Sequence, residues 1–428
     1  MTGATVGGSR GPLSLKRNIG FAMIGRGWYA ATQFLIIALT ARLGTPADVG
    51  AFTLASSIVT PLFFLATMGT RDVLTVDDLD RFNRADYLGL RITGSVAAVA
   101  VSMAVAFSAY GGRGWLVLGA VAGMAMVRFF GAQASLNHAM FQRAERLDYV
   151  AGSILLRSSA GLAGFAVVFW YTRDLPLALL AEAALWGLSY WGVDSRLLRR
   201  LGLATPVAAL KGTNLRRIGT LALWVLPVGL ALWLMRAAHS IPPLVLERHA
   251  GLAAVGLFGA LAYVHTVLSM LANAMSSAAA ARLRRYARSG RIGDFRRLTR
   301  RMVIASLGLG ALAVALAWLF GNPFVRFVFG ADYVDRRLLT LIVLASALYL
   351  VAGPLVTGVT ALQAFRWRVA ISGSCFLAGS IAALTLVPQH GALGAGGGFL
   401  ASGAAYLTIS ALAHAWLTRR RQTDRAVG

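Results

Sequence analysis

The hydrophobic pattern of this chain is a series of long apolar stretches separated by short polar segments rich in arginine. Each stretch is about 20 residues or longer, which is the length an α-helix needs to cross a bilayer. The pattern predicts an all-α polytopic membrane protein of about 12 transmembrane helices, at residues 20–42, 47–71, 88–110, 114–137, 150–171, 175–194, 217–240, 251–278, 302–321, 335–362, 368–387 and 392–417.

The two halves of the chain begin alike. The sequence ADVGAF at residues 47–52 recurs as AAVGLF at residues 253–258, about half the chain further on. A duplicated bundle of six helices is the ground plan of many transporters, in which the substrate path runs between the halves. The repeat therefore predicts an N-terminal six-helix lobe at residues 1–205 and a C-terminal six-helix lobe at residues 206–428.

Charge is sparse but strongly basic. Only 13% of the residues are charged, against about 25% in an average soluble domain, and the net charge is +25. In a soluble protein this balance would suggest nucleic acid, but here topology explains it. With both termini in the cytoplasm, most of the 41 Lys and Arg residues fall in cytoplasmic segments, as the positive-inside rule requires. No nucleic-acid partner is expected.

One cytoplasmic loop is especially basic. Residues 282–301 carry a dense run of arginines that could bind anionic membrane lipids, at roughly 1 kcal/mol for each arginine near the surface. The simpler interpretation is that the run sets the topology. Cys375 is the single cysteine, so no intrachain disulfide can form.

Ionisable residues inside the predicted spans are candidates for a functional site, because burying a charge in lipid costs several kcal/mol. They are Arg26, Arg128, Arg157, Glu182 and Arg236, with Arg71 at the cytoplasmic end of the second span. Most of these groups are cations. A cavity that they line would suit an anionic passenger, since the guanidinium binds phosphate oxygens in pairs and stays charged at every relevant pH.

Each candidate also has a structural interpretation. Arg26 is near enough to its span end to reach cytoplasmic water, and Arg128 could form an internal salt bridge with Glu182. Arg157 and Arg236 could anchor their spans at the headgroups. The histidines at positions 239, 265 and 414 are more typical of packing groups.

The sequence gives no support for an enzyme. It contains no cluster of His, Cys, Asp and Glu with the spacing of a metal site, no phosphate-binding loop and no nucleophile motif. The predicted outer loops, such as residues 241–250 and 322–334, are short and carry few ionisable groups. We therefore expect a transporter that needs no cofactor and no metal.

Four short segments resemble a known family. They are LKRN at residues 15–18, GRG at 25–27, ARLGTPADVG at 41–50 and GTRD at 69–72. Together with the predicted spans, the two lobes and the cationic interior, they resemble the polysaccharide flippases of the Wzx type, which belong to the MATE-like MOP flippase superfamily.

The resemblance implies a function and a site. Such proteins move undecaprenyl-diphosphate-linked oligosaccharides across the bacterial inner membrane by alternating access, for surface or exopolysaccharide biosynthesis, beside polysaccharide polymerase and export machinery. Two lobes rock around a central cavity whose arginines handle the diphosphate. Arg26 and Arg128 best match that role here, followed by Arg71 and Arg236.

Two alternatives remain open at this stage. A cation-coupled multidrug exporter of the same fold would usually carry essential carboxylates in the first or seventh span, where this chain has Arg26 and Arg236. A membrane polysaccharide-assembly protein without transport would need a larger outer loop. Lipid II flippases of the superfamily usually have fourteen spans. Glu182 is the one intramembrane carboxylate that the spans offer for ion coupling.

Overall fold

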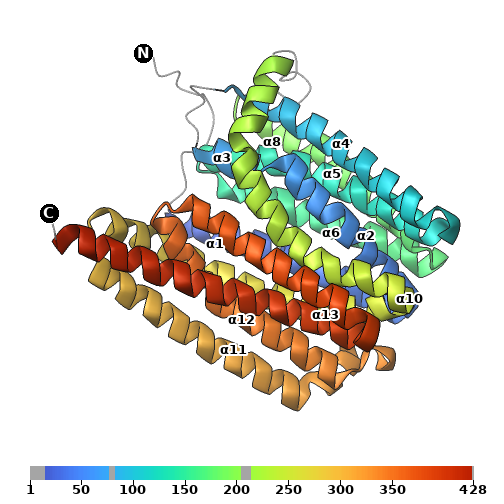
Figure 1. Ribbon diagram of the computed structural model, residues 1–428. Coiled ribbons are helices and arrows are strands. Elements are labelled where there is room, and N and C mark those ends of the chain that lie inside the picture. Colours follow the sequence, from blue (N-terminus) through green and yellow to red (C-terminus); the bar gives the residue numbers. More distant parts are fainter. Residues whose placement is uncertain (1–14, 77–81, 204–213, 427–428) are drawn as a thin grey trace. The chain divides into compact units, whose positions relative to one another are not determined.

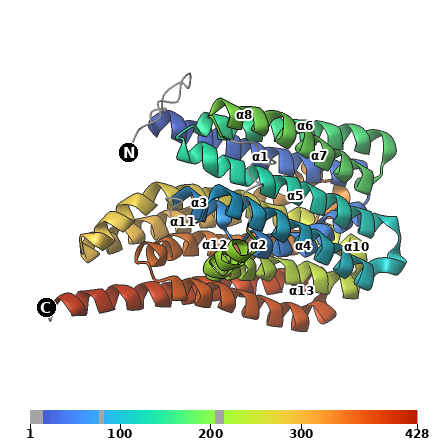
Figure 2. The ribbon, with the colours of Figure 1, turned by 90° about the horizontal axis from the view of Figure 1, so that it is seen from above.

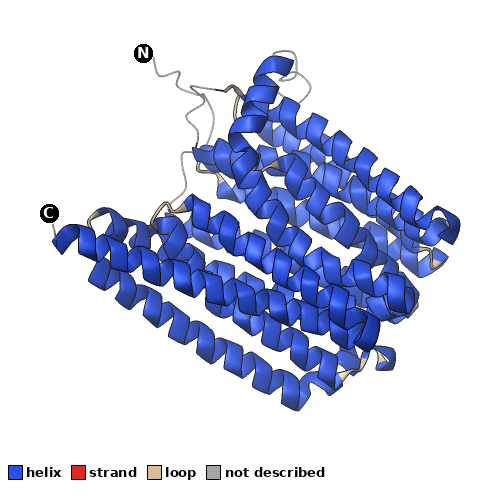
Figure 3. Cartoon of the chain, viewed as in Figure 1, coloured by secondary structure: helices blue, strands red, loops and turns tan. Residues whose placement is uncertain are grey.

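The computed structural model describes residues 15–76, 82–203 and 214–426, and these residues form helices and loops with no strand among them (Figure 3). The helices that carry the fold are α1 (Leu15–Leu43), α2 (Pro46–Thr67), α3 (Thr70–Val76), α4 (Arg84–Tyr110), α5 (Trp115–Arg143), α6 (Leu147–Thr172), α7 (Leu175–Ser189), α8 (Ser195–Arg200), α10 (Leu215–Arg288), α11 (Ile292–Val328), α12 (Arg336–Ala361) and α13 (Phe365–Ala426) (Figure 1). Short elements join them: η1 (Gly111–Arg113), η2 (Tyr190–Asp194) and η4 (Ala331–Tyr333).

The long helices confirm the all-α, polytopic prediction. Among the described residues, eight helical segments are long and apolar enough to cross a membrane. Two of them, Gly229–Ser277 and Arg366–Gln422, have 49 and 57 residues. At about 1.5 Å per residue, each is more than twice as long as a hydrocarbon core of roughly 30 Å. The count of twelve spans and the cytoplasmic position of both termini stay predictions.

Both of these double-length helices bend sharply at a glycine. Gly251 in α10 has φ 77° and ψ 180°, and Gly391 in α13 has φ 54° and ψ −126°. Only glycine adopts such angles without a steric penalty, so each break separates two helical segments. The predicted outer loop at residues 241–250 is wrong, because α10 stays helical up to the break and the side chain of Glu247 is buried there.

The second predicted span also ends too late. The helix α2 stops at Thr67, and Met68 and Gly69 both have positive φ before α3 begins at Thr70. The turn lies at the end of the apolar run, where hydrophobicity alone does not separate it from the last turn of a helix. The turn places Arg71 on a separate short helix.

The chain divides into two compact units, and their limits differ from the predicted lobes. Unit 1 contains residues 1–44 and 58–233, and unit 2 contains residues 45–57 and 234–428. The dividing points lie in the turn between α1 and α2, within α2 and within α10, instead of in the segment after α8. The two six-helix lobes, at residues 1–205 and 206–428, were predicted from the sequence repeat, and they stay a prediction.

In unit 1 the start of α10 packs beside the preceding helices. Ile218, Leu221 and Val225 belong to a buried cluster with residues of α3, α4, α5 and α6. Arg217 also forms an ion pair with the buried carboxylate of Asp86, at 3.3 Å, and Asp86 lies in the capping box that starts α4. Figure 2 shows α1, α6 and α7 lying together within the same unit.

In unit 2 the two copies of the repeated motif pack directly on each other. A Cβ atom added at Gly50 would lie 1.9 Å from the carbonyl oxygen of Leu252, and one added at Gly256 would lie 2.1 Å from that of Pro46. Side chains would hold the two backbones apart, so both motifs need glycine at this position. The repeat that the sequence shows is therefore also a contact in the fold.

Candidate functional site

A small cavity in unit 1 brings together two of the predicted arginines. It has a volume of about 90 Å³ and is lined by Phe21, Ala22, Gly25, Arg26, Arg71, Gln142, Leu147, Val150, Ala151 and Ile154. These residues come from α1, α3, α5 and α6. The cavity is large enough for a single small charged group and too small for an oligosaccharide.

The close approach of α1 and α6 shapes this cavity. A Cβ atom at Gly25 would lie 3.1 Å from the Cα atom of Ala151, so a larger residue would push the helices apart. Arg26 is exposed, and Arg71 is half-buried on α3. Arg26 and Arg71 thus line the same cavity from two different helices. Their role as substrate ligands stays a prediction.

Arg146, in the turn before α6, does not line the cavity and forms an ion pair. Arg146 donates to the carboxylate of Asp148 at 2.7 Å, and its guanidinium lies 3.9 Å from the ring centroid of Tyr149. The hydrogen bond with Asp148 raises the pKa of Arg146. The arginines that line the cavity are Arg26 and Arg71.

A polar group lies deeper along α1. Gln33 donates to Oε1 of Glu182 at 3.3 Å, and Glu182 on α7 is only 2% exposed. Arg26, Tyr29 and Gln33 are three and four residues apart, so they share one face of α1. Gln33 lies roughly 10 Å beyond Arg26 along the helix axis, at about 1.5 Å per residue.

Arg128 lies near this carboxylate without forming an ion pair with it. The charges of Arg128 and Glu182 interact, but no ion pair joins them among the described residues, and the buried Nε of Arg128 has no hydrogen-bond partner there. The salt bridge considered from the sequence is therefore not formed in this structure. The Nε atom of Arg128 is thus buried without a partner, and an anion-binding role for Arg128 stays a prediction.

Arg157 is buried instead of anchored at the membrane surface. Its side chain is 7% exposed, and its guanidinium lies 4.5 Å from the ring centroid of Trp186, one helical turn after Glu182 on α7. Gly161 makes room for this packing, since a Cβ atom there would lie 2.4 Å from Nε1 of Trp186. The anchoring interpretation of Arg157 is wrong because the aromatic ring covers it.

Asp194 is another buried carboxylate, and its place in the sequence did not reveal its burial. It ends the π-helical turn η2, a feature frequent at functional sites, and accepts a hydrogen bond from Ser153 at 2.6 Å. Ser153 also contacts Nε2 of His138 at 3.0 Å. Glu182 is therefore not the only carboxylate in the interior of this unit. Asp194 is the last residue of the predicted span at residues 175–194, where a carboxylate is expected to be in contact with water.

Arg236 belongs to unit 2, whereas Arg26, Arg71 and Arg128 belong to unit 1. Arg236 is exposed on α10, and its carbonyl accepts a hydrogen bond from Ser240. The structure thus brings Arg26 and Arg71 to one cavity and places Arg128 deeper in the same unit. The role of all four as a substrate site stays a prediction.

Two histidines of unit 2 lie together in an aromatic cluster. The ring centroids of His239 and His265 are 5.0 Å apart, and each lies 5.0–5.4 Å from the rings of Tyr349 and Phe399. Nε2 of His265 contacts the hydroxyl of Ser269 at 3.0 Å. The cluster joins α10, α12 and α13, in keeping with the packing role expected for these histidines.

No three His, Cys, Asp or Glu side chains gather to hold a metal ion in the described parts of the chain. The buried polar groups of unit 1 are instead arginines, the carboxylates of Asp86, Glu182 and Asp194, and neutral hydrogen-bonding groups. Such a lining can bind an anion and can take up or release a proton, but it lacks the oxygen-rich cage of a bound metal ion.

One curated relative and several solved structures resemble this chain, and no family model matches it. The chain is 23% identical over 381 residues to the capsular polysaccharide biosynthesis protein CapF of Staphylococcus aureus, and the match covers 89% of this chain and 94% of CapF.

The solved structures confirm the predicted MATE-like fold. The lipid II flippase MurJ in an inward closed conformation matches with a TM-score of 0.75 at 9% identity, covering 95% of this chain and 91% of MurJ. A point mutant of the Vibrio cholerae MATE transporter VcmN matches with a TM-score of 0.64 at 14% identity, covering 97% of each chain. A MOP superfamily transporter from Pyrococcus furiosus matches with a TM-score of 0.63 at 14% identity, covering 95% of this chain and 94% of that transporter.

Proposed function

We propose that this chain, a multi-pass membrane protein with the fold of the MOP superfamily transporters, moves an undecaprenyl-diphosphate-linked oligosaccharide from the cytoplasmic to the outer leaflet of a bacterial inner membrane. The observation that carries the proposal is the similarity to a capsular polysaccharide biosynthesis protein over most of both chains, on a fold shared with a lipid II flippase. All these solved structures are transporters or flippases, which supports a transporter and not an enzyme.

The arginine cavity of unit 1 supplies a place for the diphosphate. Arg26 and Arg71 face the cavity from α1 and α3, at the end of the bundle that the positive-inside rule places in the cytoplasm. Two guanidiniums can bind neighbouring phosphate oxygens with paired, charge-assisted hydrogen bonds. The small volume suits the phosphate groups, and the sugar would remain outside the cavity.

The polar face of α1 offers a second binding position for the diphosphate, further along the helix. Beyond Arg26 the face continues with Tyr29 and Gln33, and Gln33 binds Glu182 close to Arg128. As the protein alternates between its two states, the diphosphate would pass from the first cationic group to Arg128. The lipid tail would remain in the bilayer, so only the headgroup and the sugar need a polar path.

A cation-coupled multidrug exporter is the second candidate. The similarity to MATE transporters favours it, as does the buried carboxylate of Glu182, which could bind a cation or a proton. Against it stand the arginines along α1, α3 and α5, because they would repel a cationic drug. A non-transporting assembly protein finds no support in the solved structures of this fold.

Replacing Glu182 with Gln tests whether this carboxylate couples transport to an ion gradient. We expect substrate movement driven by a proton or sodium gradient in reconstituted vesicles to fall about tenfold or more, because the amide cannot bind the coupling ion. Glu145→Gln is the matched control, since Glu145 is exposed in the turn before α6. Unchanged transport with unchanged ion dependence in Glu182→Gln would remove this residue from the mechanism.

The leaflet that holds the lipid-linked oligosaccharide tests the proposed function itself. A strain without the gene, complemented with the wild-type gene or an empty vector, separates a flippase from a drug exporter. A flippase changes the leaflet of the oligosaccharide, whereas an exporter changes only drug resistance.

A further inference from the structure

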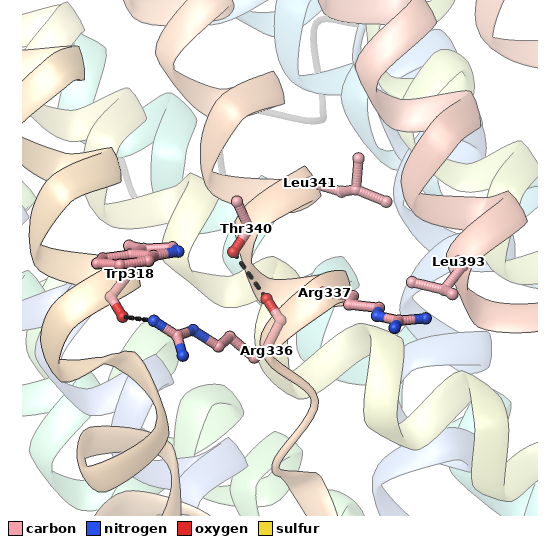
Figure 4. A pocket seen from close by; sticks show the side chains of 6 residues that line it. All are labelled: Trp318, Arg336, Arg337, Thr340, Leu341 and Leu393. Atoms are coloured by element: carbon pink, nitrogen blue, oxygen red, sulfur yellow. Dashed lines mark hydrogen bonds between the residues drawn. The ribbon is translucent and has the colours of Figure 1, made fainter.

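A second and larger cavity lies within unit 2. Its volume is about 450 Å³, and it is lined by Trp318, Arg336, Arg337, Thr340, Leu341 and Leu393 (Figure 4). Trp318 comes from the last part of α11 and the next four residues from the first turns of α12. Leu393 comes from α13, two residues after the break at Gly391.

One arginine of this cavity is held in a fixed orientation. Nη2 of Arg336 donates to the carbonyl oxygen of Trp318 at 2.8 Å, and its guanidinium lies 4.5 Å from the indole ring centroid. The Thr340 hydroxyl donates to the carbonyl oxygen of Arg336 at 2.7 Å. Figure 4 shows Arg336 and Trp318 on one side of the cavity. The guanidinium of Arg336 is thus held in place before any ligand binds.

The other arginine keeps its hydrogen-bonding capacity. Arg337 is exposed and extends toward Leu393 (Figure 4). Its guanidinium has no ion pair or hydrogen bond within the described part of the chain. The nearest acidic neighbour in sequence, Asp335, uses its carboxylate to cap α12 by accepting from the N–H of Leu338 at 3.0 Å. Arg337 therefore offers a full fork of donors to a ligand.

The rest of the cavity and its surroundings are apolar. Trp318, Leu341 and Leu393 supply its hydrophobic wall. The neighbouring part of α11 exposes the large side chains of Leu319, Phe320, Phe324 and Phe327. In a membrane protein such a surface faces lipid, and tryptophan concentrates at the boundary between hydrocarbon and headgroups. The cavity thus joins two cations to a surface suited to an acyl chain.

We propose that this cavity binds the phosphate headgroup of a lipid, with Arg337 and Arg336 holding the phosphate and the chains lying along Trp318, Leu341 and Leu393. A soluble anion would use the guanidiniums but would leave the apolar wall unoccupied. A neutral lipid would use the wall but would leave Arg337 unsatisfied. The same phosphate chemistry is offered by an anionic phospholipid and by a polyprenyl diphosphate, and the predicted topology places the cavity at the outer face.

Native mass spectrometry of the purified full-length protein tests the proposal. The protein is titrated separately with phosphatidylglycerol, undecaprenyl diphosphate and diacylglycerol, and the affinity for each is compared between wild type and Arg337→Gln. We expect the phosphate-bearing lipids to bind about tenfold more weakly to Arg337→Gln, a loss of about 1.4 kcal/mol, because the neutral amide cannot make the charge-assisted contact. Tighter binding of one phosphate lipid over the other identifies the source.

Arg248→Gln is the matched control, because Arg248 is also exposed and also lies on the predicted outer side but is not part of this cavity. Its phosphate-lipid affinity should equal that of wild type. Equal weakening by Arg337→Gln and Arg248→Gln would overturn the proposal, since charge alone would then explain binding. Diacylglycerol binding as tightly as the phosphate lipids would overturn it as well.

Discussion

Replacing Arg26 and Arg71 together with alanine is expected to reduce flipping of the lipid-linked oligosaccharide by about a hundredfold or more. Each charge-assisted hydrogen bond contributes about 1.5–3 kcal/mol, and about 1.4 kcal/mol corresponds to a factor of ten. Because both guanidiniums border one cavity, the double variant leaves that cavity without a cation from either helix. The rate is measured with purified protein in proteoliposomes.

Arg17→Ala is the matched control, because Arg17 is an exposed arginine on the same helix but does not line the cavity. It should flip at the wild-type rate. Changing Arg26 and Arg71 to lysine should give an intermediate rate, since lysine keeps the charge and loses the paired hydrogen bonds. A folded alanine double variant that flips at the wild-type rate would show that the cavity does not bind substrate.

Gly50→Ala is expected to lower the free energy of unfolding by about 1–3 kcal/mol, which is the usual range for overpacking a tight contact. The new methyl group would lie 1.9 Å from the carbonyl oxygen of Leu252, and backbone atoms cannot move aside as a flexible side chain can. Gly256→Ala should have a similar effect, because its methyl group would meet the carbonyl oxygen of Pro46. Thermal unfolding in detergent measures both.

Gly308→Ala serves as the control for this contact. Gly308 lies in the middle of α11, and no neighbouring atom lies within 4 Å of an added Cβ. Alanine favours a helix over glycine by about 1 kcal/mol, so this variant should unfold at the wild-type temperature or above it. If Gly50→Ala and Gly308→Ala unfolded alike, the close contact between the two motifs would not contribute to stability.

The helices were predictable because long apolar runs have few other outcomes in a membrane protein. The turn after α2 was not predictable, because Met68 ends the apolar run with a positive φ that its residue type does not indicate. The limits of the two units were not predictable either. They depend on which helices the ends of α2 and α10 pack against, and hydrophobicity carries no information about that choice.

Only the arginines of the candidate site could be predicted from the sequence. Arg26 and Arg71 stood out as arginines at the ends of apolar runs, and the structure places both at one cavity. Gln33 was missed because a single amide hardly changes the hydrophobicity of a span. Asp194 was missed because it ends a predicted span, where a carboxylate is expected to meet water.

The most direct test of the proposed function is the fraction of lipid-linked oligosaccharide in each leaflet of the inner membrane in a strain without this gene. We predict that the oligosaccharide collects in the cytoplasmic leaflet of the deletion strain, and that the wild-type gene returns it to the outer leaflet. The Arg26 and Arg71 double alanine variant, present at normal abundance, should fail to return it. A leaflet distribution that is the same with and without the gene would contradict the account.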